Sequence, residues 1–534
     1  MADPALTLSV LANDELANSK HKPRLIGGFR VPTLIAGAVL LACGLSLCLL
    51  SNAEAQPTNS EESGQDAQRG STSRPRQNTN SQQPPNPGKI DVPPEAILAT
   101  TSDKTIIRGG WLFDGVSDSV VRNTGIVILN GSLFEVGAEL AGRNLTEYKV
   151  IDLNDDDYIL PGLFDLHAHY NVTLAGRPRQ DELNVMPILY LANGWTSTFP
   201  AGEYDPDGMM AMRKRIDRGY QVGPRVYNSG PYFGSARRGW NRNLTKEEIY
   251  EEVDYWVLNG ARGFKAKGIA PQHLEPLIER AHWHGRTVTA HLDSGFRNSV
   301  NPRDAILMGI DRVEHFLGGD VLPDTQSAYR TLQNLDPNDP RLDEIIQLYI
   351  DHGVYFDATI AAYGSLGELG EGFEYWADEQ KYFTPEVKQW LAEQGPRRSA
   401  EMYYKIYLVK KQTIKRFFDA GGKITIGSDH PSTGTFISGF FGHREIAHLV
   451  MCGIPPAAAL KSATVHGSNA MNVGQKLGTI EPGKFADLCI VHGNPLEDIH
   501  NTHNVRLVMK AGELYDSAVL LKSVEGKLGP RGEE

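Results

Sequence analysis

The sequence predicts an α/β protein: a (β/α)8, TIM-like barrel with a small β-sandwich domain built from both the N- and C-terminal parts of the folded body. Short apolar strands alternate with helix-like stretches about eight times between residues 159 and 476, as in a closed parallel barrel. Short β-rich runs separated by Gly, Asn and Asp lie on both sides, over residues 97–158 and 477–534. We expect these two flanking pieces to complete the accessory domain together, with a short tail at the C-terminus.

The composition is that of a globular protein long enough for a large core and an accessory domain. The chain has 534 residues, of which 40% are hydrophobic and 22% charged, and its formal net charge is −12. This acidity argues against a nucleic-acid-binding surface, which needs clustered Lys and Arg. Of the four cysteines, Cys452 and Cys489 belong to the folded body and neither forms a CxxC pair. We therefore expect two buried free thiols and no thiolate metal site.

The N-terminal part of the chain is predicted to precede the folded body. Residues 31–50 form an uncharged apolar run behind a basic flank, and the A-x-A pattern of SNAEAQ follows. These features predict export, with residues 1–55 acting as a signal peptide or as a membrane anchor, and the sequence leaves both open. The body would then be periplasmic, extracellular or anchored facing outward. Residues 56–96 are predicted to be a disordered linker, because residues 56–89 contain no Leu, Ile, Val, Met or aromatic residue.

The first chemical signal is FDLHAHY, which places His167 and His169 two residues apart at the end of an apolar strand. Alternate residues of a strand point the same way, so both imidazoles can face one spot. Neutral imidazole is a common ligand of zinc and similar cations. Two solvated histidines are the simpler alternative, but active sites of barrel proteins assemble at these strand ends, which favours the metal site.

Further ligand-type residues lie at the ends of other predicted strands. The motifs are ARGFKAKG with Lys265 and Lys267, TVTAHLD with His291, RVEHF with His315, and KITIGSDH with Asp429. Taken singly, each is more simply a surface or core residue, or a helix cap. Barrel closure would bring them together, so the ordered set predicts an active site. Its members are His167, His169, Lys265, His291, His315 and Asp429.

This ordered set resembles that of the amidohydrolase superfamily, in which a barrel holds a mono- or binuclear metal site. The resemblance covers nearly all of residues 100–515. ILPGLFDLHAHYN is similar to the family's first barrel strand, and ATVHGSNAMNVGQKLGTIEPGKFADLCIVHGNPLEDI to the stretch that leaves the barrel and rebuilds the β-sandwich. GARGFKAKG, VTAHLDS, DRVEHF and TIGSDHP are most similar to a group that includes prolidase-like and imidazolonepropionase-like members.

The resemblance implies one or two divalent cations per subunit, with zinc the expected ion. His167 and His169 would bind the more buried metal ion. His291 and His315 would bind the more exposed one. Imidazole and carboxylate ligands also suit manganese, iron or cobalt, so the sequence leaves the identity of the metal open.

The resemblance also implies roles for a lysine and an aspartate. Lys265 would be carboxylated on its side-chain nitrogen and would bridge the two cations, with Lys267 as the fallback. An unmodified ammonium is a poor ligand because it has no free lone pair. Asp429 would contact the first metal ion and act as general base and then as general acid.

The predicted function is hydrolysis of a C–N bond, amide or peptide-like, in a small-molecule substrate by metal-activated hydroxide. One alternative is a mononuclear cyclic-amide hydrolase or deaminase in which Lys265 stays an ordinary amine. Another is a catalytically inactive exported protein used for binding or scaffolding. A serine hydrolase has no support, because the chain has no GxSxG motif, and it has no P-loop. The membrane is an expected partner only through an uncleaved N-terminal segment, and the sequence leaves a homo-oligomer open.

Some polar residues near the predicted strand ends stay unassigned. His430 follows Asp429, and Tyr170, Tyr232 and Tyr363 fall in predicted strand-end loops. Each is compatible with substrate contact or with ordinary loop packing, so none receives a role.

Overall fold

The computed structural model describes most of the folded body. The described ranges are 91–172, 180–367, 379–394, 400–430 and 436–529. All of them lie in one unit, Gln83–Glu534. The apolar run 31–50, with the predicted signal peptide or anchor, falls outside them, as does most of the predicted linker. Within the described ranges, no helix is both long enough and apolar enough to cross a membrane.

Eight parallel strands form the centre of the protein. They are β9 (Leu163–Ala168), β12 (Trp195–Pro200), β13 (Arg225–Val226), β14 (Gly263–Lys267), β15 (Thr287–His291), β16 (Arg312–Glu314), β17 (Tyr355–Asp357) and β18 (Ile424–Thr425). They form two parallel sheets with the orders β13-β12-β9 and β14-β15-β16-β17-β18.

Backbone hydrogen bonds connect the edges of these two sheets. Leu166 N donates to Ile426 O over 2.8 Å, which connects β9 to the residue that follows β18. Arg262 N donates to Asn228 O over 2.8 Å, which connects the residue before β14 to the chain after β13. The strands therefore follow one another in the order expected for the predicted (β/α)8 barrel.

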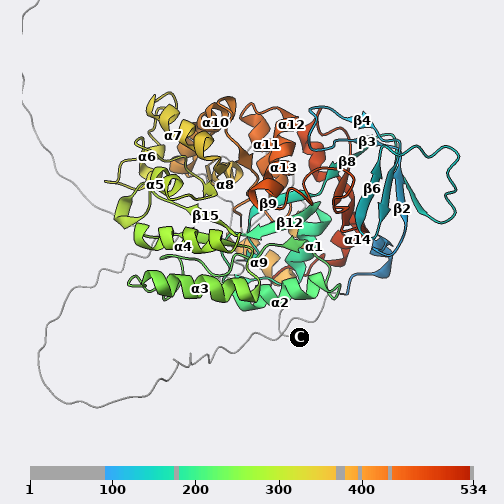
Figure 1. Ribbon diagram of the computed structural model, residues 1–534, viewed down its shortest axis with the longest axis horizontal. Coiled ribbons are helices and arrows are strands. Elements are labelled where there is room, and N and C mark those ends of the chain that lie inside the picture. Colours follow the sequence, from blue (N-terminus) through green and yellow to red (C-terminus); the bar gives the residue numbers. More distant parts are fainter. Residues whose placement is uncertain (1–90, 173–179, 368–378, 395–399, 431–435, 530–534) are drawn as a thin grey trace, which may run out of the picture. The chain divides into compact units, whose positions relative to one another are not determined.

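Helices follow most of these strands and cover them from outside (Figure 1). They are α1 (Val185–Ala192), α2 (Pro206–Asp217), α3 (Lys246–Asn259), α4 (Pro271–Trp283), α5 (Pro302–Leu307), α6 (Ala328–Leu332), α7 (Arg341–His352), α8 (Ile360–Gly367), α9 (Pro385–Gln394), α10 (Glu401–Asp419), α11 (Phe441–Met451), α12 (Pro456–Ser462) and α13 (Val465–Ala470). Helix α3 shows how local sequence sets the bounds. Thr245 and Glu248 form a capping box at its start, and Gly260 ends it at φ +112°.

Two further sheets form the β-sandwich. The seven-stranded sheet has the order β1-β21-β20-β19-β8-β3-β4, and the four-stranded sheet has the order β6-β5-β2-β7. The strands are β1 (Ile97–Ala99), β2 (Thr105–Arg108), β3 (Trp111–Leu112), β4 (Val121–Arg122), β5 (Ile126–Leu129), β6 (Ser132–Val136), β7 (Lys149–Asp152), β8 (Asp157–Pro161), β19 (Leu488–His492), β20 (Val505–Lys510) and β21 (Glu513–Asp516). The short elements η1 (Pro94–Ala96), β10 (Asn171–Val172), β11 (Gln180–Asp181), η2 (Phe296–Asn298), η4 (Ile499–His503) and α14 (Ser517–Ser523) complete the described chain.

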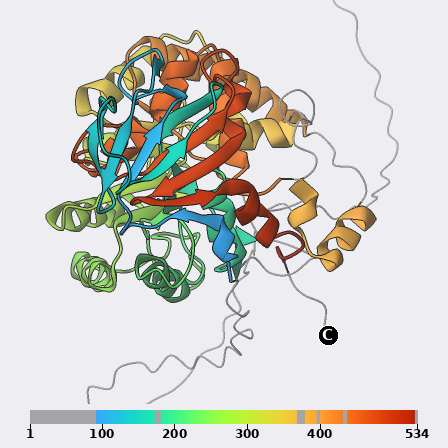
Figure 2. The same ribbon diagram turned by 90° about the vertical axis from the view of Figure 1, so that its right-hand side faces the viewer.

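The sandwich contains both ends of the folded body, as the sequence predicts. Strand β8 pairs antiparallel with β19, and β1 pairs antiparallel with β21. In Figure 2 the red C-terminal strands lie beside the blue-green N-terminal ones. Ile107 and Ile126 pack with Leu488 and Met509 in one buried apolar cluster. Neither part can bury these side chains alone, so the chain returns to this domain after completing the barrel.

The barrel and its helices share the largest core. Trp195, at the start of β12, is fully buried, and its Nε1 donates to Gly439 O over 2.6 Å. Its indole packs against Gly442 of α11, where a Cβ atom would lie 2.2 Å from Cζ2 of the ring. Cys452 and Cys489 are buried free thiols, which confirms the expectation for both.

The substitution Trp195→Ala tests this packing. Removing a fully buried indole leaves a cavity and an unpaired carbonyl, so we expect the free energy of unfolding to fall by about 3–5 kcal/mol. Trp283→Ala is the matched control, because Trp283 is 69% exposed and stacks mainly on Arg280. That loss should cost about 0.5–1 kcal/mol. Urea unfolding followed by circular dichroism would measure both, and equal midpoints would contradict the assignment of Trp195 to the core.

Candidate metal centre

The six residues predicted from the sequence all lie at the carboxyl ends of barrel strands. His167 is the penultimate residue of β9 and His169 follows that strand, while Lys265 is the middle residue of β14 and His291 ends β15. His315 directly follows β16, and Asp429 lies four residues after β18. In parallel strands these ends share one rim of the barrel, so residues distant in sequence become neighbours.

The first group of donors consists of His167, His169 and Asp429. The carboxylate oxygen Oδ1 of Asp429 lies 3.1 Å from Nε2 of His167 and 3.0 Å from Nε2 of His169. The backbone joins the same residues, because Asp429 N donates to His167 O over 3.0 Å. The arrangement places two imidazoles and one carboxylate around a single point.

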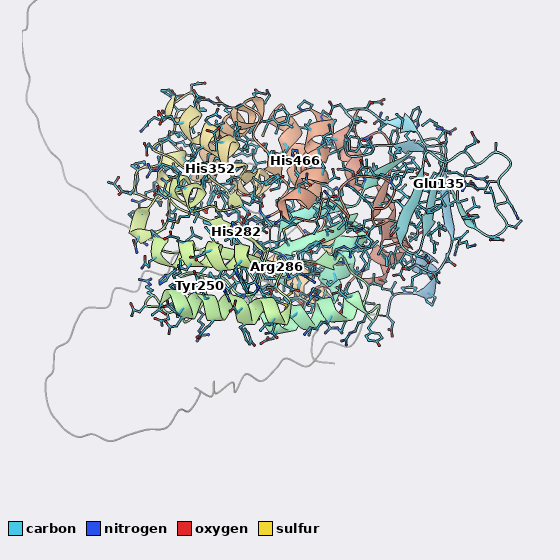
Figure 3. The ribbon with its side chains drawn as sticks, in the orientation of Figure 1. Glu135, Tyr250, His282, Arg286, His352 and His466 are labelled. Carbon is cyan, nitrogen blue, oxygen red and sulfur yellow. The ribbon has the colours of Figure 1, made fainter. Side chains whose placement is uncertain are left out.

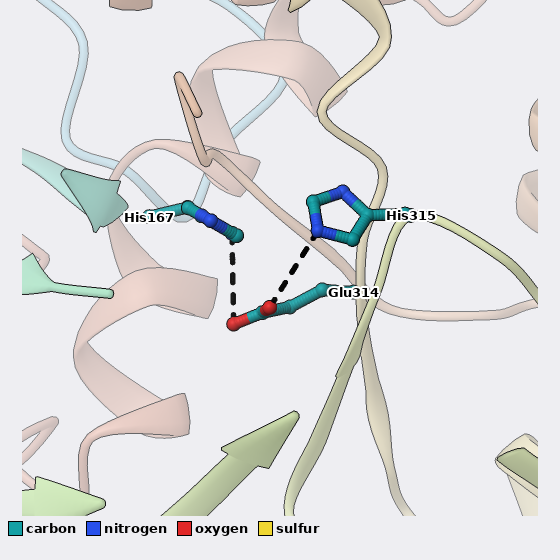
Figure 4. A group of neighbouring side chains, drawn as sticks. All are labelled: His167, Glu314 and His315. Atoms are coloured by element: carbon teal, nitrogen blue, oxygen red, sulfur yellow. Dashed lines mark ion pairs between the residues drawn. The ribbon is translucent and has the colours of Figure 1, made fainter. Parts of the chain in front are cut away.

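The second group consists of His167, Glu314 and His315 (Figure 4). Glu314 Oε1 lies 3.5 Å from Nδ1 of His167, and Oε2 lies 3.7 Å from Nε2 of His315. Lys265 Nζ forms a buried ion pair with the same carboxylate, and Thr289 Oγ1 donates to it over 2.9 Å. Glu314 is thus the residue that connects Lys265 to the histidines.

Glu314 did not enter the set predicted from the sequence, although it stands next to His315 in RVEHF. Side chains alternate along a strand, so a regular strand would direct only one of these two neighbours into the barrel. His315 has a left-handed backbone, with φ +67°, and this turns its ring toward the same centre as Glu314. The sequence feature that could have identified Glu314 is its position directly before His315, a predicted metal ligand.

His291 belongs to the same cluster through ring contact. Its ring centroid lies 4.2 Å from that of His315, but among the described residues it joins neither group of closely spaced donor atoms. His315 Nδ1 shares a hydrogen bond of 2.7 Å with Thr359 Oγ1 and lies 3.7 Å from Asp429 Oδ2. The structure thus brings all six predicted residues into one cluster and adds Glu314 to them.

Backbone strain accompanies these donors. His315, Thr359 and Asp429 have φ values of +67°, +47° and +45°, in the left-handed region that non-glycine residues seldom adopt. Such conformations cost about 1–3 kcal/mol each and persist where surrounding structure enforces them, often at functional sites. Here they turn side chains from the strand ends toward a common centre.

The electrostatics of the cluster keep the imidazoles of His291 and His315 neutral and the Asp429 carboxylate charged. Burial, reinforced by the charges of Lys267 and Lys265, lowers the pKa of His291 well below its usual value. Burial and the neighbouring His291 do the same to the pKa of His315. For Asp429 burial acts in the opposite direction. Contact with His167 and hydrogen bonds from both neighbouring histidines nevertheless hold its pKa well below the usual range.

Two buried nitrogens of this cluster fit a cation. Nδ1 of His167 and Nε2 of His315 have no hydrogen-bond partner within the described structure. Buried polar atoms usually have a partner, so two such atoms around carboxylates suggest a group that accepts their lone pairs. Imidazole nitrogen and carboxylate oxygen are the donor types of zinc and related divalent ions.

The polar residues that received no role from the sequence differ in their contacts. Tyr170 is buried and its hydroxyl pairs with Thr198 Oγ1 over 2.9 Å, while the His430 ring stacks on Phe441 at 4.1 Å. Tyr363 is also buried, and its ring lies 6.3 Å from that of His315. Of these, Tyr363 is the one whose ring contacts the cluster.

The fold and the donors together define a class: a (β/α)8 barrel protein with a candidate metal centre at the carboxyl ends of its strands. The chain belongs to the amidohydrolase family, whose model matches residues 158–515. This confirms the family predicted from the sequence.

Curated relatives are distant in sequence. The chain is 24% identical to N-substituted formamide deformylase of Arthrobacter pascens over 323 residues, which cover 56% of this chain and 51% of the relative. It therefore spans about half the length of that protein. It is 21% identical to imidazolonepropionase of Geobacillus sp. (strain WCH70) over 448 residues, which cover 74% of this chain and 92% of the relative.

Solved structures of similar fold confirm the barrel with its additional domain. A Xaa-Pro dipeptidase with bound methionine superposes with a TM-score of 0.58 at 24% identity and covers 77% of this chain and 100% of its own. Ochratoxinase of A. niger superposes with a TM-score of 0.56 at 20% identity, covering 80% and 99%. At these identities the likeness concerns the fold.

The ion pair of Lys265 and Glu314 can be tested in metal-stripped protein. Glu314→Gln leaves a buried ammonium without its anion, so we expect the free energy of unfolding to fall by about 3–5 kcal/mol. The double variant Lys265→Met/Glu314→Gln removes both charges and should recover much of that loss. Chemical denaturation of the wild type and the variants, including Lys265→Met alone, completes the cycle. Strictly additive effects would show that the two side chains do not interact.

Proposed function

We propose that this protein is a metal-dependent amidohydrolase that cleaves a C–N bond, amide or peptide-like, in a small-molecule substrate. The observation that carries the proposal is the convergence of the six predicted residues at one rim of the barrel, with Asp429 Oδ1 within 3.1 Å of two imidazoles. Membership of the amidohydrolase family supports the same reaction class. Two proteins that the chain resembles, an N-substituted formamide deformylase and a Xaa-Pro dipeptidase, support an amide or peptide bond as the target.

The histidines of the cluster would bind the metal ions, and Asp429 would transfer the proton. His167 and His169 would hold one divalent cation, with zinc expected, and His291 and His315 a second. A bound cation would lower the pKa of water to about 7 and polarise the scissile carbonyl. The Asp429 carboxylate, charged and aimed into the cluster, would take a proton from the attacking water and deliver it to the leaving nitrogen.

Lys265 has a surrounding that suits carboxylation. Burial lowers the pKa of its ammonium, although the Glu314 carboxylate opposes this. The free amine would attack carbon dioxide, form an N–C bond and lose one proton, which yields a carbamate anion. The carbamate and the buried Glu314 carboxylate are both anions and would repel each other. We therefore propose that carboxylation occurs together with cation binding. The centre would then be binuclear.

We further propose that the body acts outside the cytoplasm. The basic flank followed by the apolar run 31–50 supports export, whether the segment is cleaved or kept as an anchor.

Elemental analysis tests the number of cations. A binuclear centre predicts two tightly bound metal ions per chain, and Lys265→Ala should reduce this number to one or none because the bridging ligand is lost. Lys267→Ala distinguishes the two lysines of this strand: with Lys265 as the bridge it should keep both metal ions, whereas a loss in Lys267→Ala instead would identify the fallback ligand. One metal ion per chain in wild type and Lys265→Ala alike would favour the mononuclear hydrolase or deaminase.

Asp429→Asn tests the proton transfer. Loss of a general base is expected to lower kcat/KM by about 10²–10⁴-fold. The measurement uses metal-loaded wild type and variant on N-acyl amino acids, N-formyl amines and Xaa-Pro dipeptides. Asp324→Asn, a change at an exposed aspartate of a strand-end loop, is the control and should leave kcat/KM unchanged. A metal-replete wild type without activity on any of these substrates would instead favour a binding or scaffolding protein.

A further inference from the structure

A second polar cavity lies at the opposite end of the barrel from the metal centre. Its volume is about 640 Å³, and its lining includes five basic and two acidic side chains. Arg225 begins β13, and Arg262 and Arg286 immediately precede β14 and β15. Figure 3 labels Arg286 near the end of helix α4, on the side of the barrel that faces the sandwich. Along β15, His291 lies five positions after Arg286, which is about 16 Å of extended chain.

Barrel and sandwich both contribute to this basic cavity, which we define by its five cationic residues. They are Arg213, Arg225, Arg262, Arg286 and Lys510. Lys510 ends strand β20 of the sandwich, whereas Arg213 lies on helix α2. A concentration of positive charge stands out in a chain whose net charge is −12.

Acidic residues neutralise only part of this charge. Arg213 pairs with Asp217 at 3.2 Å, and Arg225 pairs with Asp487 at 3.2 Å. Lys510 Nζ donates to a backbone carbonyl, Gly223 O, over 2.7 Å. These contacts account for two of the five positive charges, and Glu513, which also lines the cavity, places a third carboxylate near Lys510.

Arg262 and Arg286 have no such compensation. Neither guanidinium has an ion pair or a side-chain hydrogen bond to any residue in the described part of the chain, and Nε of Arg286 is buried without a partner there. Both guanidiniums line the same cavity, and burial together with the charge of Arg262 lowers the pKa of Arg286. Burial and the charge of Arg225 also lower the pKa of Lys510, to about 8. Like charges held together in this way are stabilised when an anion enters between them.

The chemistry of the cavity selects among anions. Guanidinium groups bind phosphate through paired, charge-assisted hydrogen bonds, and two unpaired arginines can hold one phosphate from two sides. The volume lies in the range of small-molecule sites, about 300–1,000 Å³. Tyr227 and Met471 supply buried apolar surface to the same cavity. A long polyanion such as nucleic acid would meet the acidic remainder of the surface, which favours a compact ligand.

We propose that this basic cavity, between the strand-start end of the barrel and the sandwich, binds a small phosphate-bearing molecule, with Arg262 and Arg286 as its principal ligands. The site is separate from the metal centre and does not depend on the proposed hydrolytic activity.

Isothermal titration calorimetry with inorganic phosphate, and in parallel with pyrophosphate, tests the proposal on the metal-loaded full-length chain at fixed ionic strength. We expect Arg262→Ala/Arg286→Ala to weaken the binding at this site by about tenfold or more, because two charge-assisted contacts are lost. Phosphate bound at the metal centre would persist in this variant. Loss of the basic cavity alone would therefore lower the number of phosphates bound per chain by one. Lys214→Ala, which removes a charge on the outside of α2, should bind as the wild type does.

Thermal unfolding provides the second measurement. Without phosphate, the double variant should unfold at the same temperature as the wild type or higher, because it loses a repulsive contact. Arg286→Glu should fold as well, since it offers Arg262 an anion, and it should bind no phosphate in this cavity. The proposal is overturned by a wild type that binds neither probe, by a double variant with unchanged stoichiometry and affinity, or by an equal loss in Lys214→Ala.

Discussion

The candidate metal centre depends on the join between the first and last strands of the barrel. The backbone hydrogen bond from Asp429 N to His167 O holds two segments together that are 262 residues apart in sequence. The same join places the Asp429 carboxylate beside the imidazoles of His167 and His169. Without it, the Asp429 carboxylate would lose the contacts with His167 and His169 that hold its pKa well below the usual range. Because the strands are parallel, every other donor reaches this rim in the same direction.

Glu314 supplies the negative charge that pairs with the buried Lys265 ammonium inside the barrel. Its carboxylate accepts from Lys265 and Thr289 and faces His167 and His315, all of them buried. A buried ion pair is costly to break and seldom adds stability compared with apolar packing, so its presence here reflects the chemistry of the site. In the proposed binuclear centre, Lys265 would be an ammonium paired with Glu314 when no cation is bound and a carbamate when cations are bound. The charge of Lys265 would change only when cations bind beside it.

The two ends of the barrel separate two kinds of chemistry. Donor atoms of metal-ligand type gather at the strand ends, whereas unpaired arginines gather at the strand starts, where the barrel meets the sandwich. Strands β14 and β15 connect the two directly, since each begins after an arginine and carries a residue of the metal centre. A barrel whose strands are rigid and parallel keeps such sites apart while holding each in fixed geometry. The return of the chain into the sandwich supplies Lys510 to the lining of the basic cavity.

The sequence by itself determined the strand-helix alternation, the division of the sandwich between both ends of the body, and the six residues His167, His169, Lys265, His291, His315 and Asp429 of one cluster. These follow from local periodicity and from motifs at strand ends, which depend on neighbouring residues in the chain. The tertiary structure alone decided that Glu314 joins the cluster, because the left-handed backbone at His315 breaks the alternation that would have separated the two. It alone also revealed the basic cavity, since Arg225, Arg262, Arg286 and Lys510 lie far apart in the sequence and become neighbours only when barrel and sandwich pack together. Contacts between elements distant in sequence are set by packing, and packing leaves no local pattern to read.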